Sequence, residues 1–85
     1  MPGPPRRTIL TRMHSSVTLT LNGESRVFEG QAAAFSVSAL LAALGLETKK
    51  VAVERNEEIV PRSRYAETWL ATGDSLEIVH FIGGG

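Results

Sequence analysis

Apolar residues alternate with polar ones from Val17 to Leu21. This period of two is typical of a β-strand that buries one face. Asn22 and Gly23 follow directly, and both residue types accept the positive φ angles of a tight hairpin turn. The segment is therefore predicted to be the first strand of a β-hairpin.

A second strand is predicted over about residues 25–29. Its register depends on the length of the loop before it. A two-residue loop and a three-residue loop that includes Glu24 would put Val27 and Phe28 on opposite faces, because side chains alternate along a strand. The sequence does not decide between the two loops, and the register stays open.

A helical stripe follows the hairpin. Its apolar residues, at positions i, i+3, i+4 and i+7, are Val37, Leu40, Leu41 and Leu44. Ser36 is a suitable N-cap, and Gly45 is a suitable left-handed C-terminal cap. We expect the stripe to pack on the sheet.

Short strands are predicted at residues 51–53 and 59–60. Pro61 has no backbone N–H, so it marks a sheet edge or the end of a strand. Residues 65–70 are expected to form a short helical or irregular connection, in which Trp69 fills the core.

The most apolar strand-like run, residues 76–82, follows a turn at residues 72–74. A central strand is typically apolar on both faces, and this run has that character. The order of elements favours a β-grasp fold of the α+β class: a mixed sheet of about five strands on one main helix, with the last strand central and parallel to the first. The predicted domain covers residues 16–82.

The composition narrows the class of protein. The 85 residues are 42% hydrophobic and 21% charged, which indicates one small globular domain. No apolar stretch approaches the roughly 20 residues of a membrane span. Nine basic residues balance nine acidic ones, so there is no electrostatic footprint for nucleic acid. Cysteine is absent, which excludes disulfides, thiolate catalysis and cysteine-based metal sites.

Residues 1–15 differ from the rest because they begin with a run rich in proline and arginine. They are expected to be a disordered leader or a mis-called start before Met13, with a targeting segment as the alternative; the apolar part of a secretory signal is missing. Without Arg6, Arg7 and Arg12 the domain carries six basic and nine acidic residues. Such a mildly acidic domain would suit a basic docking surface on a partner.

Three glycines close the sequence: Gly83, Gly84 and Gly85. Glycine has no Cβ and takes both signs of φ, so such a tail fits a narrow tunnel. A carboxylate is a poor electrophile, and acyl chemistry at Gly85 needs activation, most simply as an acyl-adenylate made by a partner with ATP. The chain contains no glycine-rich phosphate motif, so the enzyme that binds ATP and activates Gly85 is expected to be a separate protein. An inert tail is the alternative.

Four stretches of the chain carry a family resemblance. They are Val51 to Asn56, Ile59 to Ala66, Gly73-Asp74 and Glu77 to Gly85. In these motifs, residues 16–85 resemble the ThiS family of sulfur carriers in thiazole biosynthesis, within the ubiquitin-like MoaD/ThiS group of β-grasp carriers. Only residues 1–15 lie outside the resemblance.

The resemblance implies a cycle of sulfur transfer at Gly85. An E1-like adenylyltransferase (ThiF) would use Mg-ATP to form an acyl-adenylate on Gly85. Persulfide sulfur from a cysteine desulfurase system would then displace AMP and leave a thiocarboxylate, which thiazole synthase (ThiG) would take into the thiazole phosphate of thiamine. Gly83 and Gly84 would thread the tunnel of the partner. The chain itself would be a cytoplasmic carrier, monomeric when free, with no catalytic residue and no bound cofactor.

The parity of the last strand predicts an exposed apolar patch. If Glu77 faces water, Val79 and Phe81 share its face, and the even-numbered residues of 76–82 face the helix. The same parity exposes Ala52 on the neighbouring strand. An exposed apolar patch of this kind is typical of a protein interface, so these residues are candidates for docking.

Coverage of that patch by Tyr65 or by residues 1–15 is the alternative. His80 is expected to be partly buried near the end of the strand. No second histidine of the fold could join it as a metal ligand, and no metal site is predicted.

Three other functions stay open. The chain could be the small subunit of a molybdopterin synthase, although residues 79–82 differ from the sequence that usually precedes the diglycine in that family. It could be a ubiquitin-like modifier joined to lysines through Gly85. It could also be an RNA-associated β-grasp binding module with an incidental tail, against which the neutral charge argues.

Overall fold

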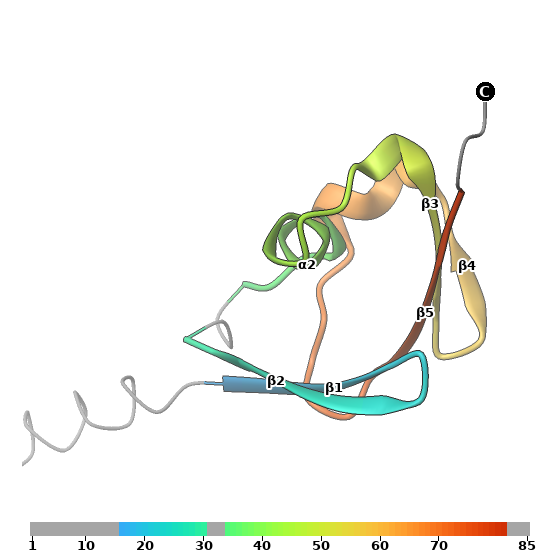
Figure 1. The fold of residues 1–85 in the computed structure, drawn as a ribbon. Helices are drawn as coiled ribbons and strands as arrows, with labels where there is room; N and C mark the ends of the chain where they lie inside the picture. The colour runs from blue at the N-terminus through green and yellow to red at the C-terminus, as the bar shows by residue number, and fades with distance from the viewer. Residues whose placement is uncertain (1–15, 31–33, 82–85) are drawn as a thin grey trace, which may run out of the picture.

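The computed structural model describes residues 16–30 and 34–81 (Figure 1). The predictions for residues 1–15, for Ile82 and for the glycine tail therefore lie outside the described residues. The elements are β1 (Ser16–Leu21), β2 (Glu24–Glu29), α2 (Val37–Ala43), η1 (Thr48–Lys50), β3 (Val51–Arg55), β4 (Glu58–Val60), η2 (Arg62–Glu67) and β5 (Ser75–His80).

The five strands form one mixed sheet in the order β2-β1-β5-β3-β4. β5 is central, runs parallel to β1 and pairs antiparallel with β3. α2 lies against one face of this sheet (Figure 1). The predicted α+β fold, with its central last strand, is confirmed.

The first hairpin resolves the register that the sequence left open. Its loop holds two residues, Asn22 and Gly23, at φ 49° and 88°. Phe28 therefore lies opposite Val17 on the core side of the sheet. Val27 points away from the core and is 55% exposed.

Both ends of α2 are fixed by the predicted caps. The Ser36 Oγ accepts a hydrogen bond from the backbone N–H of Ala39 at 3.0 Å. At the other end Gly45 has φ 74°, and the N–H of Leu46 donates to the carbonyl of Leu41 at 2.9 Å. This 6→1 bond is that of a Schellman motif, and it ends the helix after two turns.

One core lies between α2 and the sheet. Its buried apolar residues are Val17, Leu19, Leu21, Phe35, Val37, Leu40, Leu41, Val51, Val53, Val60, Tyr65, Leu70 and Leu76. Two aromatic residues in it, Phe35 and Tyr65, were not predicted as core residues.

The prediction that Trp69 fills the core is wrong, because its side chain is 57% exposed. Residues 68–70 run extended beside residues 35–37, with Leu70 N–H donating to the Phe35 carbonyl at 2.8 Å. Side chains alternate along such a segment, so Leu70 points inward and Trp69 points out. Phe35, only 1% exposed, fills the core instead.

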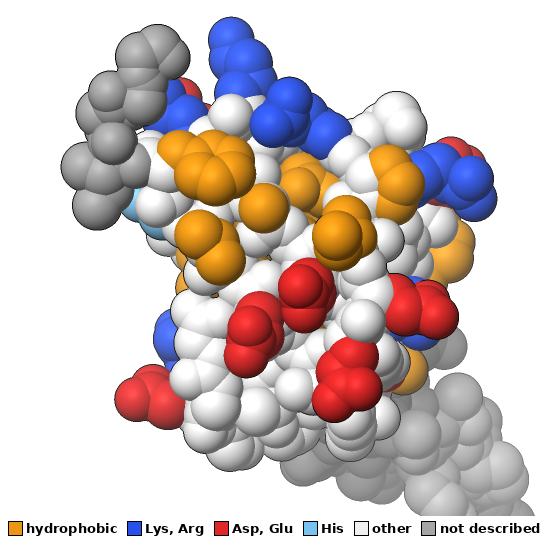
Figure 2. All heavy atoms as spheres, turned by 90° about the vertical axis from the view of Figure 1, so that its right-hand side faces the viewer, with side chains coloured by type: hydrophobic (Ala, Val, Ile, Leu, Met, Phe, Trp, Pro, Cys, Tyr) orange, Lys and Arg blue, Asp and Glu red, His pale blue; other side chains and the backbone are white. Residues whose placement is uncertain are grey.

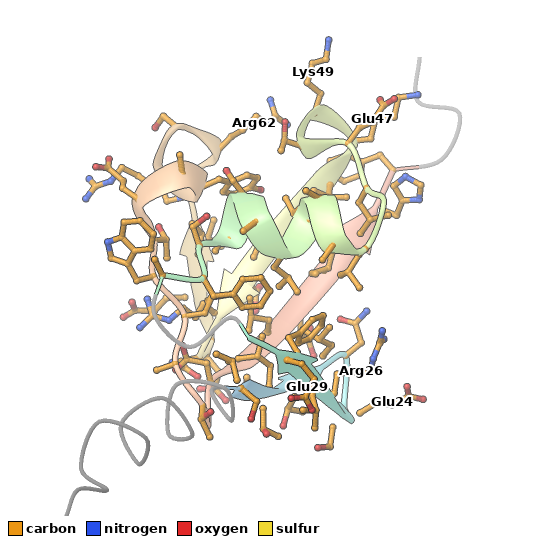
Figure 3. The ribbon with its side chains drawn as sticks, turned by 90° about the vertical axis from the view of Figure 1, so that its left-hand side faces the viewer. Glu24, Arg26, Glu29, Glu47, Lys49 and Arg62 are labelled. Atoms are coloured by element: carbon orange, nitrogen blue, oxygen red, sulfur yellow. The ribbon has the colours of Figure 1, made fainter. Side chains whose placement is uncertain are left out.

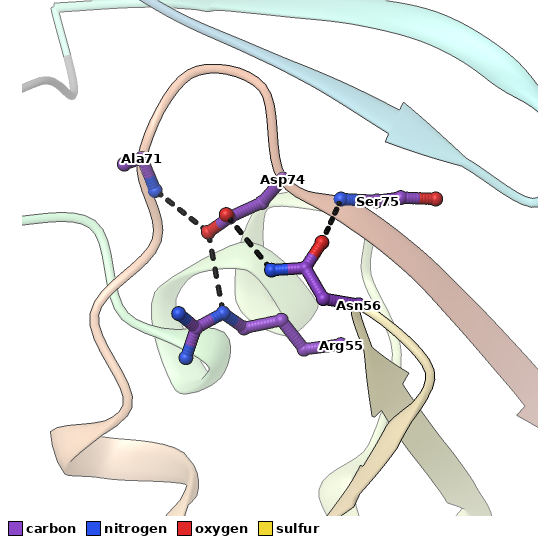
Figure 4. Close-up of polar contacts among 5 residues, drawn as sticks. All are labelled: Arg55, Asn56, Ala71, Asp74 and Ser75. Atoms are coloured by element: carbon purple, nitrogen blue, oxygen red, sulfur yellow. Dashed lines mark hydrogen bonds and ion pairs between the residues drawn. The ribbon is translucent and has the colours of Figure 1, made fainter.

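A polar network ties the β3–β4 turn to the start of β5 (Figure 4). Asp74 accepts hydrogen bonds from the Ala71 N–H at 2.9 Å and from Asn56 Nδ2 at 3.1 Å. Asn56 Oδ1 in turn accepts from the Ser75 N–H at 2.9 Å. Arg55 Nε lies 3.3 Å from the Asp74 carboxylate, but its N–H is not aligned for a hydrogen bond. The Arg55 contact is therefore an ion pair without a hydrogen bond, and the Asp74 carboxylate organises the turn.

Candidate functional site

The face of the sheet opposite α2 exposes a group of apolar side chains (Figure 2). We call it the open-face patch, and it consists of Ala52, Ile59, Val79 and Phe81. Ile59 is 77% exposed, Val79 56% and Phe81 47%. These values are high for large apolar residues, which usually lose most of their exposed surface on folding.

Strand register brings the patch together. Ala52 on β3 lies directly opposite Val79 on β5, and Ile59 on β4 lies opposite Glu54, one step further along the same face of β3. The N–H of Phe81 still donates to the Lys50 carbonyl, at 2.7 Å, so the chain stays paired to the end of the described residues.

The predicted exposure of Ala52, Val79 and Phe81 is confirmed. Ile59 was not predicted as a member of the patch. Its position depends on the turn between β3 and β4. Asn56 and Glu57 take positive φ angles of 52° and 71° in that turn, and a two-residue turn places Ile59 opposite Glu54. The residue types of Asn56 and Glu57 alone do not predict a two-residue turn.

Charged side chains flank the patch, acidic on one side and basic on the other (Figure 2). Glu54 and Glu77 are direct cross-strand neighbours, and with Glu57 and Ser75 they line a hollow of about 320 Å³. Like charges directly opposite each other on a sheet are destabilising. A docking partner with basic groups would relieve this repulsion.

Basic residues gather near η1, at the end of the molecule away from Glu24 and Glu29 (Figure 3). There, the Arg62 guanidinium donates to the Lys49 carbonyl at 3.4 Å. Lys50 belongs to the same segment and pairs with Phe81 through its carbonyl. The open-face patch therefore separates regions of opposite charge.

Tyr65 does not cover the patch, so that alternative is wrong. The Tyr65 side chain is 3% exposed, and its hydroxyl donates to the Val51 carbonyl at 3.4 Å. Tyr65 thus belongs to the core between the helix and the sheet. Coverage by residues 1–15 lies outside the described residues.

His80 is exposed, and the prediction that it is partly buried is wrong. It does lie on the helix side of β5, where it lines a hollow of about 380 Å³ with Leu44 and Leu46. α2 ends at Ala43, so no helix reaches over the end of β5. Among the residues that the structure describes, no group of His, Asp and Glu side chains could hold a metal ion.

Gly85 is four residues beyond Phe81 in the sequence. Four residues of extended chain span at most about 14 Å, which limits how far from Phe81 a C-terminal reaction at Gly85 could take place. In the described part of the chain, no helix is long and apolar enough to cross a membrane.

The ThiS family model matches residues 19–85, a match that includes all three terminal glycines. The chain is 52% identical over 50 residues to the sulfur carrier protein ThiS of Bacillus subtilis, covering 59% of this chain and 76% of that protein. It is also 57% identical over 67 residues to a thiazole synthase of Paramagnetospirillum magneticum, covering 79% of this chain but only 20% of that much longer protein.

A solved structure shares the fold. The crystal structure of the thiamine biosynthesis protein ThiS from Geobacter metallireducens superposes with a TM-score of 0.69 at 36% sequence identity, covering 81% of this chain and all of that one. The family match over most of the chain, the related carrier and the shared fold agree. The chain belongs to the ThiS family of sulfur carrier proteins, which are carriers in thiamine biosynthesis and not enzymes.

Proposed function

We propose that Gly85 carries sulfur as a C-terminal thiocarboxylate. An E1-like adenylyltransferase uses Mg-ATP to convert the Gly85 carboxylate to an acyl-adenylate and releases pyrophosphate. A persulfide from a cysteine desulfurase system attacks the acyl carbon, AMP leaves, and reduction of the S–S bond by a thiol leaves the thiocarboxylate. Thiazole synthase then accepts the sulfur.

The observation that carries this proposal is the family match, which runs through the glycine tail to Gly85. The absence of cysteine supports it as well, because the chain has no thiol on which sulfur could be held instead. Gly83 and Gly84 let the tail enter a tunnel too narrow for side chains. The carrier contributes no catalytic side chain, and its work is in the cytoplasm.

The open-face patch is the proposed docking surface for these partners. Its apolar centre lies beside Glu54 and Glu77, which favours a partner with an apolar contact surface and basic groups at its rim. Thiazole synthase is the partner that the comparisons favour, because the matched relative in Paramagnetospirillum magneticum bears that name and includes a segment like this chain.

Mass spectrometry of the C-terminal peptide tests the proposal. The full chain is incubated with ATP, an E1-like adenylyltransferase of thiamine biosynthesis and sulfide, and the C-terminal peptide is then isolated. Exchange of one oxygen for sulfur adds about 16 Da to that peptide. An unchanged mass, with the adenylyltransferase shown to be active on its own carrier, would refute the proposal.

A further inference from the structure

β5 has strand neighbours on both sides over only part of its length. β3 pairs with it from Leu76 to His80. β1 pairs with it only at Ser75 and Leu76, because β1 ends there in the hairpin turn. Beyond Leu76 the central strand therefore has one edge without a neighbouring strand.

The side chain of Asn22 extends the ladder by one step. The N–H of Ile78 donates to Asn22 Oδ1 at 2.8 Å, and Asn22 Nδ2 donates to the Ile78 carbonyl at 3.2 Å. The backbone N–H of Asn22 meanwhile donates to the Leu76 carbonyl at 2.9 Å. The amide group thus replaces the next residue of β1, and the ladder ends at Ile78.

His80 is the next residue whose backbone faces this edge. In an antiparallel pair, alternate residues point their backbone groups to the neighbour and away from it. Phe81 donates to Lys50, and Ser75 accepts from Asn56, each at 2.7 Å, so the odd-numbered residues of β5 face β3. The N–H and C=O of His80 face the other way, and no described residue forms a hydrogen bond with either group.

A hollow lies directly beside this edge, between the first hairpin and the end of α2. We call it the hairpin pocket. It measures about 380 Å³ and is lined by Leu21, Asn22, Glu24, Arg26, Leu44, Leu46, Ile78 and His80. Glu24 and Arg26 project from β2 on the side where α2 ends (Figure 3), and they form a polar rim around an aliphatic floor. Such a floor suits an aliphatic side chain.

We propose that an extended segment of thiazole synthase adds to the sheet as a further strand at His80, and that it places an aliphatic side chain in the hairpin pocket. This inference rests on the proposed function. In strand addition, backbone hydrogen bonds supply affinity and side-chain pockets supply specificity.

Two observations indicate that the segment added at His80 belongs to a partner already docked on the open-face patch. His80 lies between Val79 and Phe81, so the edge is continuous with the open-face patch. A single residue offers only one donor and one acceptor, which is too little for an isolated peptide but sufficient beside a larger interface. Exposed edges are usually protected by proline, lysine or a bulge, and residues 77–81 contain neither proline nor lysine.

The test compares His80→Pro with His80→Ala in calorimetric titrations of the full chain with the cognate thiazole synthase. Proline removes an N–H that pairing with β3 does not use, whereas alanine keeps it. Both variants lose the imidazole that lines the hairpin pocket, and only proline also loses the N–H. We therefore expect His80→Pro to bind at least 10-fold more weakly than His80→Ala. A urea titration of each variant establishes that it is folded.

Amide hydrogen exchange of the unchanged chain gives a second measurement that needs no variant. The His80 N–H should exchange much faster than those of Val79 and Phe81 in the free chain, and at least 10-fold more slowly once the synthase is bound. Methyl resonances of Leu44 and Leu46 should shift at the same time.

Three outcomes would overturn the inference. The first is equal affinity of folded His80→Pro and His80→Ala variants for the synthase. The second is unchanged exchange of the His80 N–H in the complex, and the third is protection of that N–H that grows with the concentration of the free chain, which would indicate a second copy. Failure of the unchanged chain to bind the synthase at all would instead count against that enzyme as a partner in the proposed function.

Discussion

Replacing Phe81 by alanine tests whether Phe81 contributes mainly to partner binding or mainly to the stability of the core. The Phe81 side chain is 47% exposed. An aromatic side chain buries about 150–250 Å² when fully covered, so roughly 100 Å² of Phe81 remains available to a partner. At about 25 cal/mol per Å², and allowing for the surface that alanine keeps, its burial contributes about 2 kcal/mol to binding, or roughly 30-fold in Kd.

The same areas limit the loss of folding stability. About half of the side chain is already covered, and areas measured against an extended chain overstate burial, so Phe81→Ala should lower the free energy of unfolding by about 1–2 kcal/mol. Leu76→Ala on the same strand is the matched control. Leu76 is 1% exposed, and its truncation should cost about 2–5 kcal/mol.

The assay measures urea unfolding and affinity for the adenylyltransferase or thiazole synthase with both variants. We expect weakened binding with moderate destabilisation for Phe81→Ala, and large destabilisation for Leu76→Ala. If Phe81→Ala lost 3–5 kcal/mol of stability and the folded fraction bound with unchanged affinity, Phe81 would be a core residue and the docking argument would fail.

Three further predictions concern other parts of the chain. Asp74→Ala should lower the free energy of unfolding by about 1–2 kcal/mol, because it removes the partly buried carboxylate that accepts hydrogen bonds from Ala71 and Asn56; Glu67→Ala, which breaks only an exposed ion pair, should change it by less than about 0.5 kcal/mol in the same urea titration. Glu54→Lys should raise the free energy of unfolding by about 0.2–1 kcal/mol by replacing repulsion from Glu77 with attraction, yet weaken partner binding, and a gain in affinity would contradict the proposed basic rim. Deleting residues 84–85 should abolish adenylation and leave the thermal midpoint unchanged, since both residues come after the last described strand in the sequence; adenylate formation on the shortened chain would contradict Gly85 as the carrier.

The sequence predicts the elements of this fold better than their mutual positions. The alternation from Val17 to Leu21 and the caps Ser36 and Gly45 are local signals, and the structure confirms them. Whether Phe28 faced the core depended on one residue of loop length, which no local pattern determines. The register of β2 against β1 could be assigned only from the structure of the sheet.

The errors have the same origin. Trp69 points outward because its segment runs beside residues 35–37, a contact between positions more than thirty residues apart. His80 is exposed because α2 ends too early to cover it. For the candidate site, strand parity was enough to expose Val79 and Phe81, but Ile59 joined them only through a turn with two positive φ angles.

The place of β5 in the sheet also affects how the domain folds. β1 and β2 form one hairpin, β3 and β4 form another, and the sheet order shows that only β5 joins them. An isolated two-stranded hairpin is marginally stable at best in water. The parallel pair of Leu21 with Leu76 closes a long stretch of chain, and such distant contacts slow folding. Neither hairpin is stable as a sheet until β5 pairs with it, so the domain should fold and unfold in one cooperative step. That step depends on β5, the strand that leads to the tail.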